Sequence, residues 1–207
     1  ILMQNVSARA QRRVEKDEEA GESGMPYLQM RNLVVADDGS LLLVGEQYHY
    51  EVVSNGRQTY IKSFYQDILA TRINADGSLA WMKRLPKNQQ GGGARGGLGF
   101  VLLNGGGKHT MFFLDNVKNL DLPTDKVPSA HVDGQGGYLT AYQLDDASGD
   151  VTKLSVFDTK EVKSKMAVYQ FTTDRIVQVS DNEFIVEFYK KDKQDVLIRV
   201  NLTGATK

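Results

Sequence analysis

Short apolar runs alternate with turn-forming residues along most of the chain. The first turn, at 37–40, contains Gly39, which can adopt a positive φ, and the apolar runs on either side of it predict a β-hairpin. A similar turn at 74–78 separates two later runs. The run 41–53 alternates in its second half, which is typical of a strand with two different faces. Four consecutive antiparallel strands are therefore predicted, at 33–36, 41–53, 68–73 and 79–85.

The same order of strands recurs twice. A second set is expected at 98–103, 109–115, 138–144 and 151–157, and a third at 175–179, 183–189 and 196–202. In each set the third strand ends at an Asn or Asp followed by a Gly, namely Asn74, Asp145 and Asn201, at intervals of 71 and 56 residues. Antiparallel four-stranded units in series are typical of a β-propeller. We therefore predict an all-β, β-propeller-like fold of about three four-stranded antiparallel blades, at 27–90, 91–160 and 161–207.

One turn carries a sharper motif. The segment 73–78 ends a strand in Ile73 and Asn74, turns at Gly77, and is followed by Trp81 four residues later. This pattern resembles the repeat of secreted bacterial β-propeller proteins, including the quinoprotein-like type. In organisation the resemblance covers residues 30 to 207. It implies a propeller and an extracytoplasmic location, periplasmic or secreted, but no catalytic residue, because the fold hosts many functions.

The number of blades bears on how the fold closes. Closed propellers have four to eight blades, whereas the 207 residues supply about three. We expect either that the chain is an arc completed by the remaining blades of a longer chain or by another subunit, or that the sheets close by another route.

The first 26 residues differ from the rest in composition. Between Ala8 and Glu22 almost every residue is charged or small, and a helix here would carry too thin an apolar stripe to bury much surface. We interpret 1–26 as a charged N-terminal arm or solvated helix, with a helix that docks on a partner as the alternative.

Composition excludes several classes of function. The chain has 25 basic and 26 acidic residues, so no net field favours nucleic acid, and no apolar run approaches the roughly 20 residues of a membrane-spanning helix. The absence of cysteine excludes disulfides, thiolate metal sites and a cysteine nucleophile. The histidines, His49, His109 and His131, lack the spacing of a helical zinc motif.

A glycine-rich stretch at 91–99 formally contains G-x-G-x-x-G. A phosphate site requires that motif to open a helix, but here it leads into a predicted strand. We interpret the stretch as a connection between blades and expect no cofactor.

Oxygen donors gather after the strand that ends near Asp115. Asp115, Asn119 and Asp121 are the densest such set and hence the candidate calcium ligands, although calcium takes six to eight oxygens and the set is short of that number. We therefore predict no metal site.

Aromatic side chains gather around Glu46 and His49. Tyr48 and Tyr50 lie in the same run, and Tyr60 and Tyr65 follow. Aromatic rings with a few polar groups are what a sugar or peptide site uses, so these four tyrosines are the candidate ligand-binding residues. Strand alternation separates His49 from Tyr48 and Tyr50, and one face must therefore be used for packing.

These features favour a non-enzymatic, extracytoplasmic binding or interaction module whose ligand is a glycan or another protein. Two alternatives stay open. One is a propeller-type polysaccharide hydrolase or lyase, with Glu46, His49 and Asp115 as candidate catalytic residues. The other is a structural arc of a larger extracellular protein.

Overall fold

The computed structural model describes residues 24–92, 97–133, 137–158, 168–190 and 194–202. The predicted N-terminal arm, 1–26, lies almost wholly outside these residues. Within them the prediction of an all-β protein is confirmed, since the strands form separate, mainly antiparallel sheets and no sheet closes on itself. No helix among the described residues is long and apolar enough to cross a membrane.

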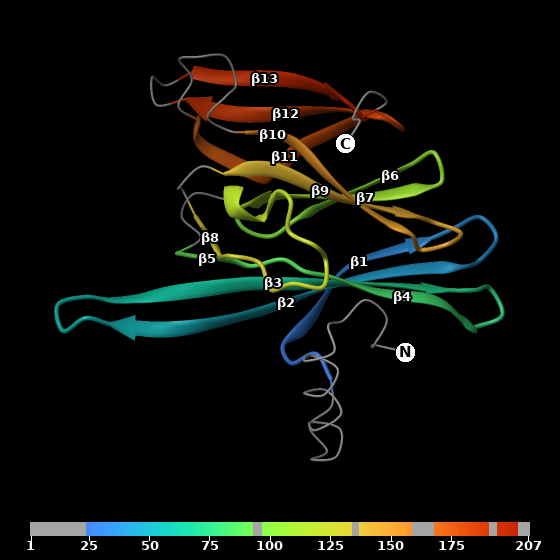
Figure 1. The fold of residues 1–207 in the computed structure, drawn as a ribbon, viewed down its shortest axis with the longest axis horizontal. Coiled ribbons are helices and arrows are strands. Elements are labelled where there is room, and N and C mark those ends of the chain that lie inside the picture. Colours follow the sequence, from blue (N-terminus) through green and yellow to red (C-terminus); the bar gives the residue numbers. More distant parts are fainter. Residues whose placement is uncertain (1–23, 93–96, 134–136, 159–167, 191–193, 203–207) are drawn as a thin grey trace.

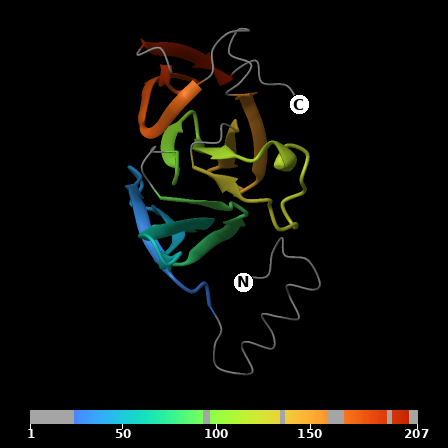
Figure 2. The same ribbon diagram turned by 90° about the vertical axis from the view of Figure 1, so that its left-hand side faces the viewer.

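Three sheets follow one another along the chain, and Figures 1 and 2 show the second lying between the first and the third. The first sheet contains β1 (Leu28–Val35), β2 (Leu41–Ser54), β3 (Thr59–Ile73) and β4 (Leu79–Leu85), with β5 (Gln89–Gly91) beside β3 and β8 (His131–Val132) beside β5. The second contains β6 (Val101–Gly105), β7 (Lys108–Asp115), β9 (Tyr138–Asp145) and β10 (Val151–Asp158), and the third β11 (Val168–Ser180), β12 (Glu183–Lys190) and β13 (Gln194–Asn201). A short 3-10 helix, η1 (Val117–Asn119), follows β7.

The three sets of strands expected from the sequence thus lie in separate sheets of four, four and three main strands, in the predicted order. The strand bounds differ in places, since β1 begins at Leu28 instead of 33 and β11 at Val168 instead of 175, and two differences change the architecture. The third strand of the first set begins at Thr59 instead of 68, which makes a long β2–β3 hairpin. In addition, β8 comes from the segment assigned to the second blade but pairs with β5 in the first sheet, in parallel. That pairing is between distant segments, and local pattern carries no information about it.

Alternation along β7 explains why the sheets stack. Met111 and Phe113 point into a core shared with the first sheet, whereas Phe112 and Leu114 point into a core shared with the third. Because successive side chains of a strand face opposite ways, an apolar run of this kind buries both faces of the sheet. The second sheet is therefore covered on both sides.

The first core is closed at the outer strands by Trp81 of β4. Its indole Nε1 donates a hydrogen bond to the carbonyl of Asp146, 2.9 Å away, in the turn between β9 and β10. In the same turn Gly149 adopts φ +69°, and a Cβ built there would lie 2.7 Å from the indole ring. A glycine at this position therefore provides both the turn and the space for the tryptophan.

Candidate functional site

The β2–β3 hairpin extends beyond the three sheets, at the left of Figure 1. We call its outer part, residues 48–65, the arm, which is a different segment from the predicted N-terminal arm at 1–26. Its turn is fixed by Asn55, whose Oδ1 accepts hydrogen bonds from the backbone N–H groups of Arg57 (3.1 Å) and Gln58 (2.9 Å), and Gly56 supplies the positive φ. The alternation of aromatic and β-branched residues favours a strand on both sides of this turn.

One face of the arm is apolar and open to solvent. Tyr50, Val52 and Ile61 lie on it, because Tyr50 pairs with Ser63 and Val52 with Ile61 across the hairpin. All three are more than half exposed. Closer to the sheets the same face carries Tyr48 and Tyr65, whose ring centroids are 4.7 Å apart. The face therefore runs from a paired aromatic base to an exposed apolar tip.

The opposite face of the arm is organised around His49. Its ring stacks on Phe64 with centroids 4.6 Å apart, and Tyr27 packs on it at 5.2 Å. Lys62 Nζ lies 4.9 Å from the Phe64 ring centroid, within the range of a cation–π contact. Tyr60 also lies on this face, paired with Val53 and half exposed.

Charged side chains hold the base of the arm. The Arg31 guanidinium lies 5.5 Å and 5.7 Å from the ring centroids of Tyr48 and Tyr65, and its Nε donates to Glu46 Oε2 at 3.0 Å. On its other side the Glu46 carboxylate meets Lys87, with Nζ 2.8 Å from Oε1. We call Arg31, Glu46 and Lys87 the Glu46 cluster.

Lys87 is completely buried, and its ammonium contacts three oxygen atoms. Besides Glu46, its ammonium donates to the carbonyl of Tyr65 (3.1 Å) and to Gln89 Oε1 (2.9 Å). Burial lowers the pKa of Lys87, and Glu46 opposes that shift. Burial likewise raises the pKa of Tyr65. These contacts fill the donors of the ammonium and leave it no free proton for a substrate, so the cluster is a structural support of the arm.

The predicted ligand-binding residues are thus divided between two faces. Tyr48, Tyr50 and Tyr65 share one face of the arm, and Tyr60 lies on the other. The candidate catalytic residues are not brought together either. Glu46 is buried in its ion pairs and His49 is stacked on the opposite face of the arm. Asp115 lies at the end of β7 in the second sheet.

The candidate calcium ligands Asp115 and Asn119 do lie together, but a lysine occupies their centre. Lys153 Nζ is 3.2 Å from Asp115 Oδ2 and 2.5 Å from the carbonyl of Asn119, while Asn119 Nδ2 donates to Asp115 Oδ1 at 2.6 Å. The ammonium neutralises the carboxylate that a cation would need. The third candidate, Asp121, is exposed and belongs to none of these contacts. Among the described residues no group of three or more His, Asp or Glu side chains is placed to hold a metal ion.

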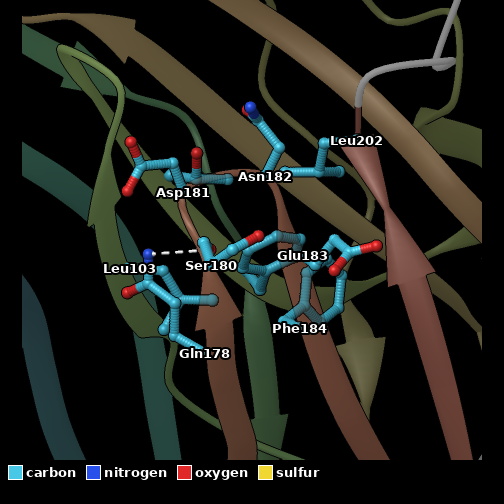
Figure 3. A pocket seen from close by; sticks show the side chains of 10 residues that line it. Leu103, Gln178, Ser180, Asp181, Asn182, Glu183, Phe184 and Leu202 are labelled. Atoms are coloured by element: carbon cyan, nitrogen blue, oxygen red, sulfur yellow. Dashed lines mark hydrogen bonds between the residues drawn. The ribbon is translucent and has the colours of Figure 1, made fainter.

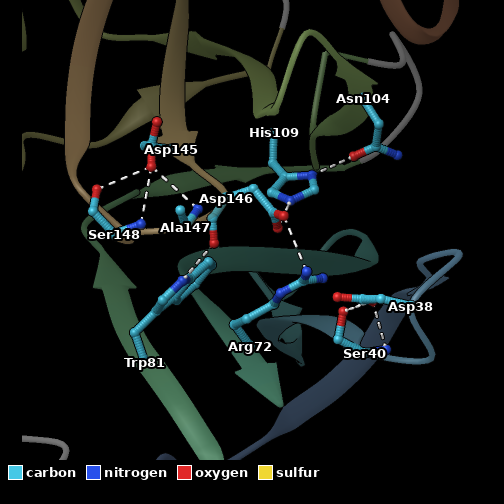
Figure 4. Close-up of polar contacts among 10 residues, drawn as sticks. All are labelled: Asp38, Ser40, Arg72, Trp81, Asn104, His109, Asp145, Asp146, Ala147 and Ser148. Carbon is cyan, nitrogen blue, oxygen red and sulfur yellow. Dashed lines mark hydrogen bonds and ion pairs between the residues drawn. The ribbon is translucent and has the colours of Figure 1, made fainter. Parts of the chain in front are cut away.

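A buried histidine belongs to a polar cluster that links the first two sheets, at the edge shown in Figure 4. His109 Nε2 lies 2.7 Å from Asp146 Oδ1, and its Nδ1 lies 2.8 Å from Asn104 Oδ1. Arg72 of the first sheet donates to the other oxygen of Asp146 at 3.0 Å. Sequence analysis missed this cluster, although Arg72 and Asp146 both border the repeated Asn/Asp turns. The cluster contains no nucleophile, and its contacts join sheet to sheet.

A shallow depression lies between the β6–β7 and β11–β12 hairpins (Figure 3). Gln178 lies at its edge and donates to the carbonyls of Asn104 (2.7 Å) and Ser180 (3.2 Å). Small-molecule sites usually enclose about 300–1,000 Å³. The depression has room for little more than one water molecule, and the arm is therefore the stronger candidate for a binding surface.

His131 of β8 makes the stability of the protein pH-dependent. It is buried, its Nε2 has no hydrogen-bond partner among the described residues, and burial lowers its pKa below the ordinary 6.5. Below about pH 6.5, His131 therefore binds a proton in the unfolded chain but stays neutral in the folded protein. We expect the free energy of unfolding to fall as the pH drops from 7 to 5, by up to about 1.4 kcal/mol per pH unit from this group.

Urea unfolding at pH 7.5, 6.0 and 5.0 measures this slope, with His131→Asn as the comparison. The variant should lose the part of the slope that His131 contributes, even if its stability at pH 7.5 differs. Parallel pH profiles for the two proteins would show that His131 does not carry the effect.

Comparisons of the chain with protein-family models, with curated proteins and with solved structures found no match.

Proposed function

We propose that the protein is a non-enzymatic, extracytoplasmic interaction module of the β-propeller type, and that the arm is its binding surface. The exposed apolar face of the arm carries the proposal: Tyr50, Val52 and Ile61 are held in water on a hairpin that the Glu46 cluster braces. An exposed apolar patch on a rigid element is typical of an interaction site. The stack of sheets, each packed face to face on the next, supports the propeller part of the proposal.

The chemistry of the arm favours a protein ligand over a glycan. Glycan sites combine aromatic rings with several polar groups that orient the hydroxyls. Beside Tyr50 the face instead offers Val52 and Ile61. Aromatic and aliphatic side chains together are typical of the centre of a protein–protein contact. The alternative enzyme function has no comparable support, because Glu46, His49 and Asp115 lie in three separate environments.

A double substitution at the tip tests the proposal. Tyr50→Ser with Ile61→Ser removes most of the apolar area of this face, and we expect at least a tenfold loss of affinity for the ligand, because one buried aromatic anchor contributes about 2 kcal/mol or more. The ligand is sought by photo-crosslinking from position 52 in the source cells, and a glycan array is probed in parallel. Affinity for the captured protein is then measured by biolayer interferometry.

The matched control is Tyr60→Ser with Val53→Ser, which removes similar groups from the opposite face of the same arm. It should retain the affinity. Equal losses in the two variants, or glycan binding that both variants keep, would rule out the apolar face as the binding surface. Cell fractionation tests the location: recovery in the cytoplasm would contradict an extracytoplasmic module.

The alternative of a structural arc is favoured by a separate observation. The outward faces of the first and third sheets both present exposed apolar residues, for example Leu33 and Val35 on β1 and Val177 and Val179 on β11. The second sheet has both faces covered, whereas each terminal sheet has one covered face. A stack of this kind accepts further sheets at its ends.

A further inference from the structure

The outward face of the first sheet has the character of a buried face. Val34, Leu42 and Val44 point into the first core. Their neighbours along the strands, Leu33, Val35, Leu41 and Leu43, therefore point away from it. Leu33 and Val35 are 58% and 63% exposed. We call this surface the leading face.

The leading face corresponds, position by position, to faces that are buried in the other two sheets. Leu43 pairs with Thr71, three residues before Asn74. Met111 holds the same place in the second sheet, because it pairs with Tyr142, three residues before Asp145. Val186 holds it in the third, because it pairs with Ile198, three residues before Asn201. Met111 and Val186 are both fully buried against the preceding sheet. The first sheet thus presents to solvent the surface with which its two counterparts pack on a neighbour.

The outward face of the third sheet is the other end of the series. Val177, Val179 and Leu197 lie exposed on it, opposite in direction to the core residues Ile176 and Ile198. We call it the trailing face. It also carries Arg199, which pairs with Glu183 at 2.5 Å and whose side chain is largely exposed.

Arg199 holds the same place in the third sheet that Arg72 holds in the first. Each arginine lies two residues before the Asn that ends the third strand. Each also pairs with a residue of the second strand, Arg72 with Leu42 and Arg199 with Ile185. Arg72 reaches across to Asp146 in the turn of the next sheet. The turn at the corresponding place in the first sheet, 74–78, has Ala75 at the position of Asp146 and an exposed Asp76 next to it. Asp76 is therefore the carboxylate that Arg199 would meet in a contact of the same kind, in exchange for its present partner Glu183.

We propose that two copies of this chain associate head to tail, the trailing face of each packing on the leading face of the other. Each contact would repeat the sheet-to-sheet contact already present twice within the chain, with Arg199 opposite Asp76 as Arg72 is opposite Asp146. A head-to-tail contact closes into a ring when the rotation allows. Two copies would give six sheets, within the four to eight of closed propellers.

The surface available is sufficient for a stable dimer. Three strands spaced about 4.8 Å apart, with seven residues of about 3.3 Å each, span roughly 14 Å by 23 Å. Two such contacts, counting both partners, bury about 1,300 Å², which lies in the range of specific protein interfaces. This proposal does not depend on the arm, which projects from the stack.

Light scattering coupled to size-exclusion chromatography of the whole chain tests the proposal. We expect the wild-type protein to be a dimer. Leu33→Lys blocks the leading face and Val177→Lys the trailing face, and each variant alone should be a monomer. Mixed in equal amounts, the two variants should form a dimer only at higher concentration than the wild type, because one contact is intact while the other contains both lysines. Tyr50→Lys, on the arm, is the matched control and should leave the wild-type dimer unchanged.

A charge exchange tests the orientation of the contact. Arg199→Glu should raise the dissociation constant of the dimer about 25-fold, because the dimer contains two exposed ion pairs at about fivefold each, and Arg199→Glu combined with Asp76→Arg should restore it. Circular dichroism checks that each variant is folded, which is expected because all five substituted positions are exposed.

Several results would overturn the proposal. A wild-type monomer would assign the two faces to sheets of another polypeptide. A Val177→Lys variant that stays dimeric would mean that two leading faces pack on each other. Assembly that grows beyond a dimer with concentration would mean that the contact does not close.

Discussion

Replacement of Glu46 with alanine is expected to lower the free energy of unfolding by about 3–5 kcal/mol, because it leaves the buried ammonium of Lys87 without its counter-charge. Lys87 has no route to water, since its side chain is completely buried. Arg31, the other partner of Glu46, is one-third exposed and can turn to solvent. The loss therefore arises mainly from Lys87. Urea unfolding followed by the fluorescence of Trp81, the only tryptophan, measures it.

Two further variants isolate the cause. Glu46→Leu combined with Lys87→Met replaces the pair by apolar groups of similar size and should recover most of the stability, because it leaves no buried charge. Glu187→Ala removes a carboxylate from the largely exposed pair with Arg175 and should cost less than about 1 kcal/mol. If Glu46→Ala and Glu187→Ala destabilise the protein equally, the buried ion pair does not hold the base of the arm.

Replacement of Gly149 with alanine is expected to lower the free energy of unfolding by about 2–4 kcal/mol. The backbone there is left-handed, which disfavours any residue with a Cβ by about 1 kcal/mol or more. The added methyl would also lie 2.7 Å from the indole ring of Trp81, and overpacking of a filled core costs about 1–3 kcal/mol. Thermal and urea unfolding measure the sum.

Gly77 provides the matched control, because it occupies the corresponding turn of the first sheet. It has a similar φ, +84°, but a Cβ built on it meets nothing within 4 Å. Gly77→Ala should therefore show only the backbone part of the effect. A Gly149→Ala variant no less stable than Gly77→Ala would show that contact with the tryptophan does not limit the residue at 149.

The strands and turns of this protein follow from local chemistry, which explains why they were predictable. Gly39 and Gly77 adopt the positive φ that their turns require, and the Asp residues beside them accept hydrogen bonds from nearby Ser side chains and backbone. Alternation along the second half of β2 was likewise visible in the sequence. The start of β3 was misplaced, since the polar and aromatic residues of the arm lack the continuous apolar run of a buried strand.

The candidate site was predictable only in part. Tyr48 and Tyr65 do pair, and the tyrosines of the arm were identified from their composition. Their division between two faces depends on the register of the hairpin, and a shift of one residue would reverse it. The Glu46 cluster could not have been foreseen, because Lys87 lies 41 residues from Glu46 and beyond two intervening strands. Its burial results from packing.

The sequence by itself determined that the chain is a series of antiparallel strands in three sets, because pleat and turn are decided by neighbouring residues. Only the tertiary structure decided which distant groups meet: Trp81 with Gly149 between two sheets, and His109 with Asp146 and Lys87 with Glu46 within one sheet. These contacts join residues from 37 to 68 positions apart, and their partners are chosen by how the strands pair and how the sheets stack. The same stacking leaves the outward faces of the first and third sheets exposed. The proposed interactions depend on those two faces and on the arm.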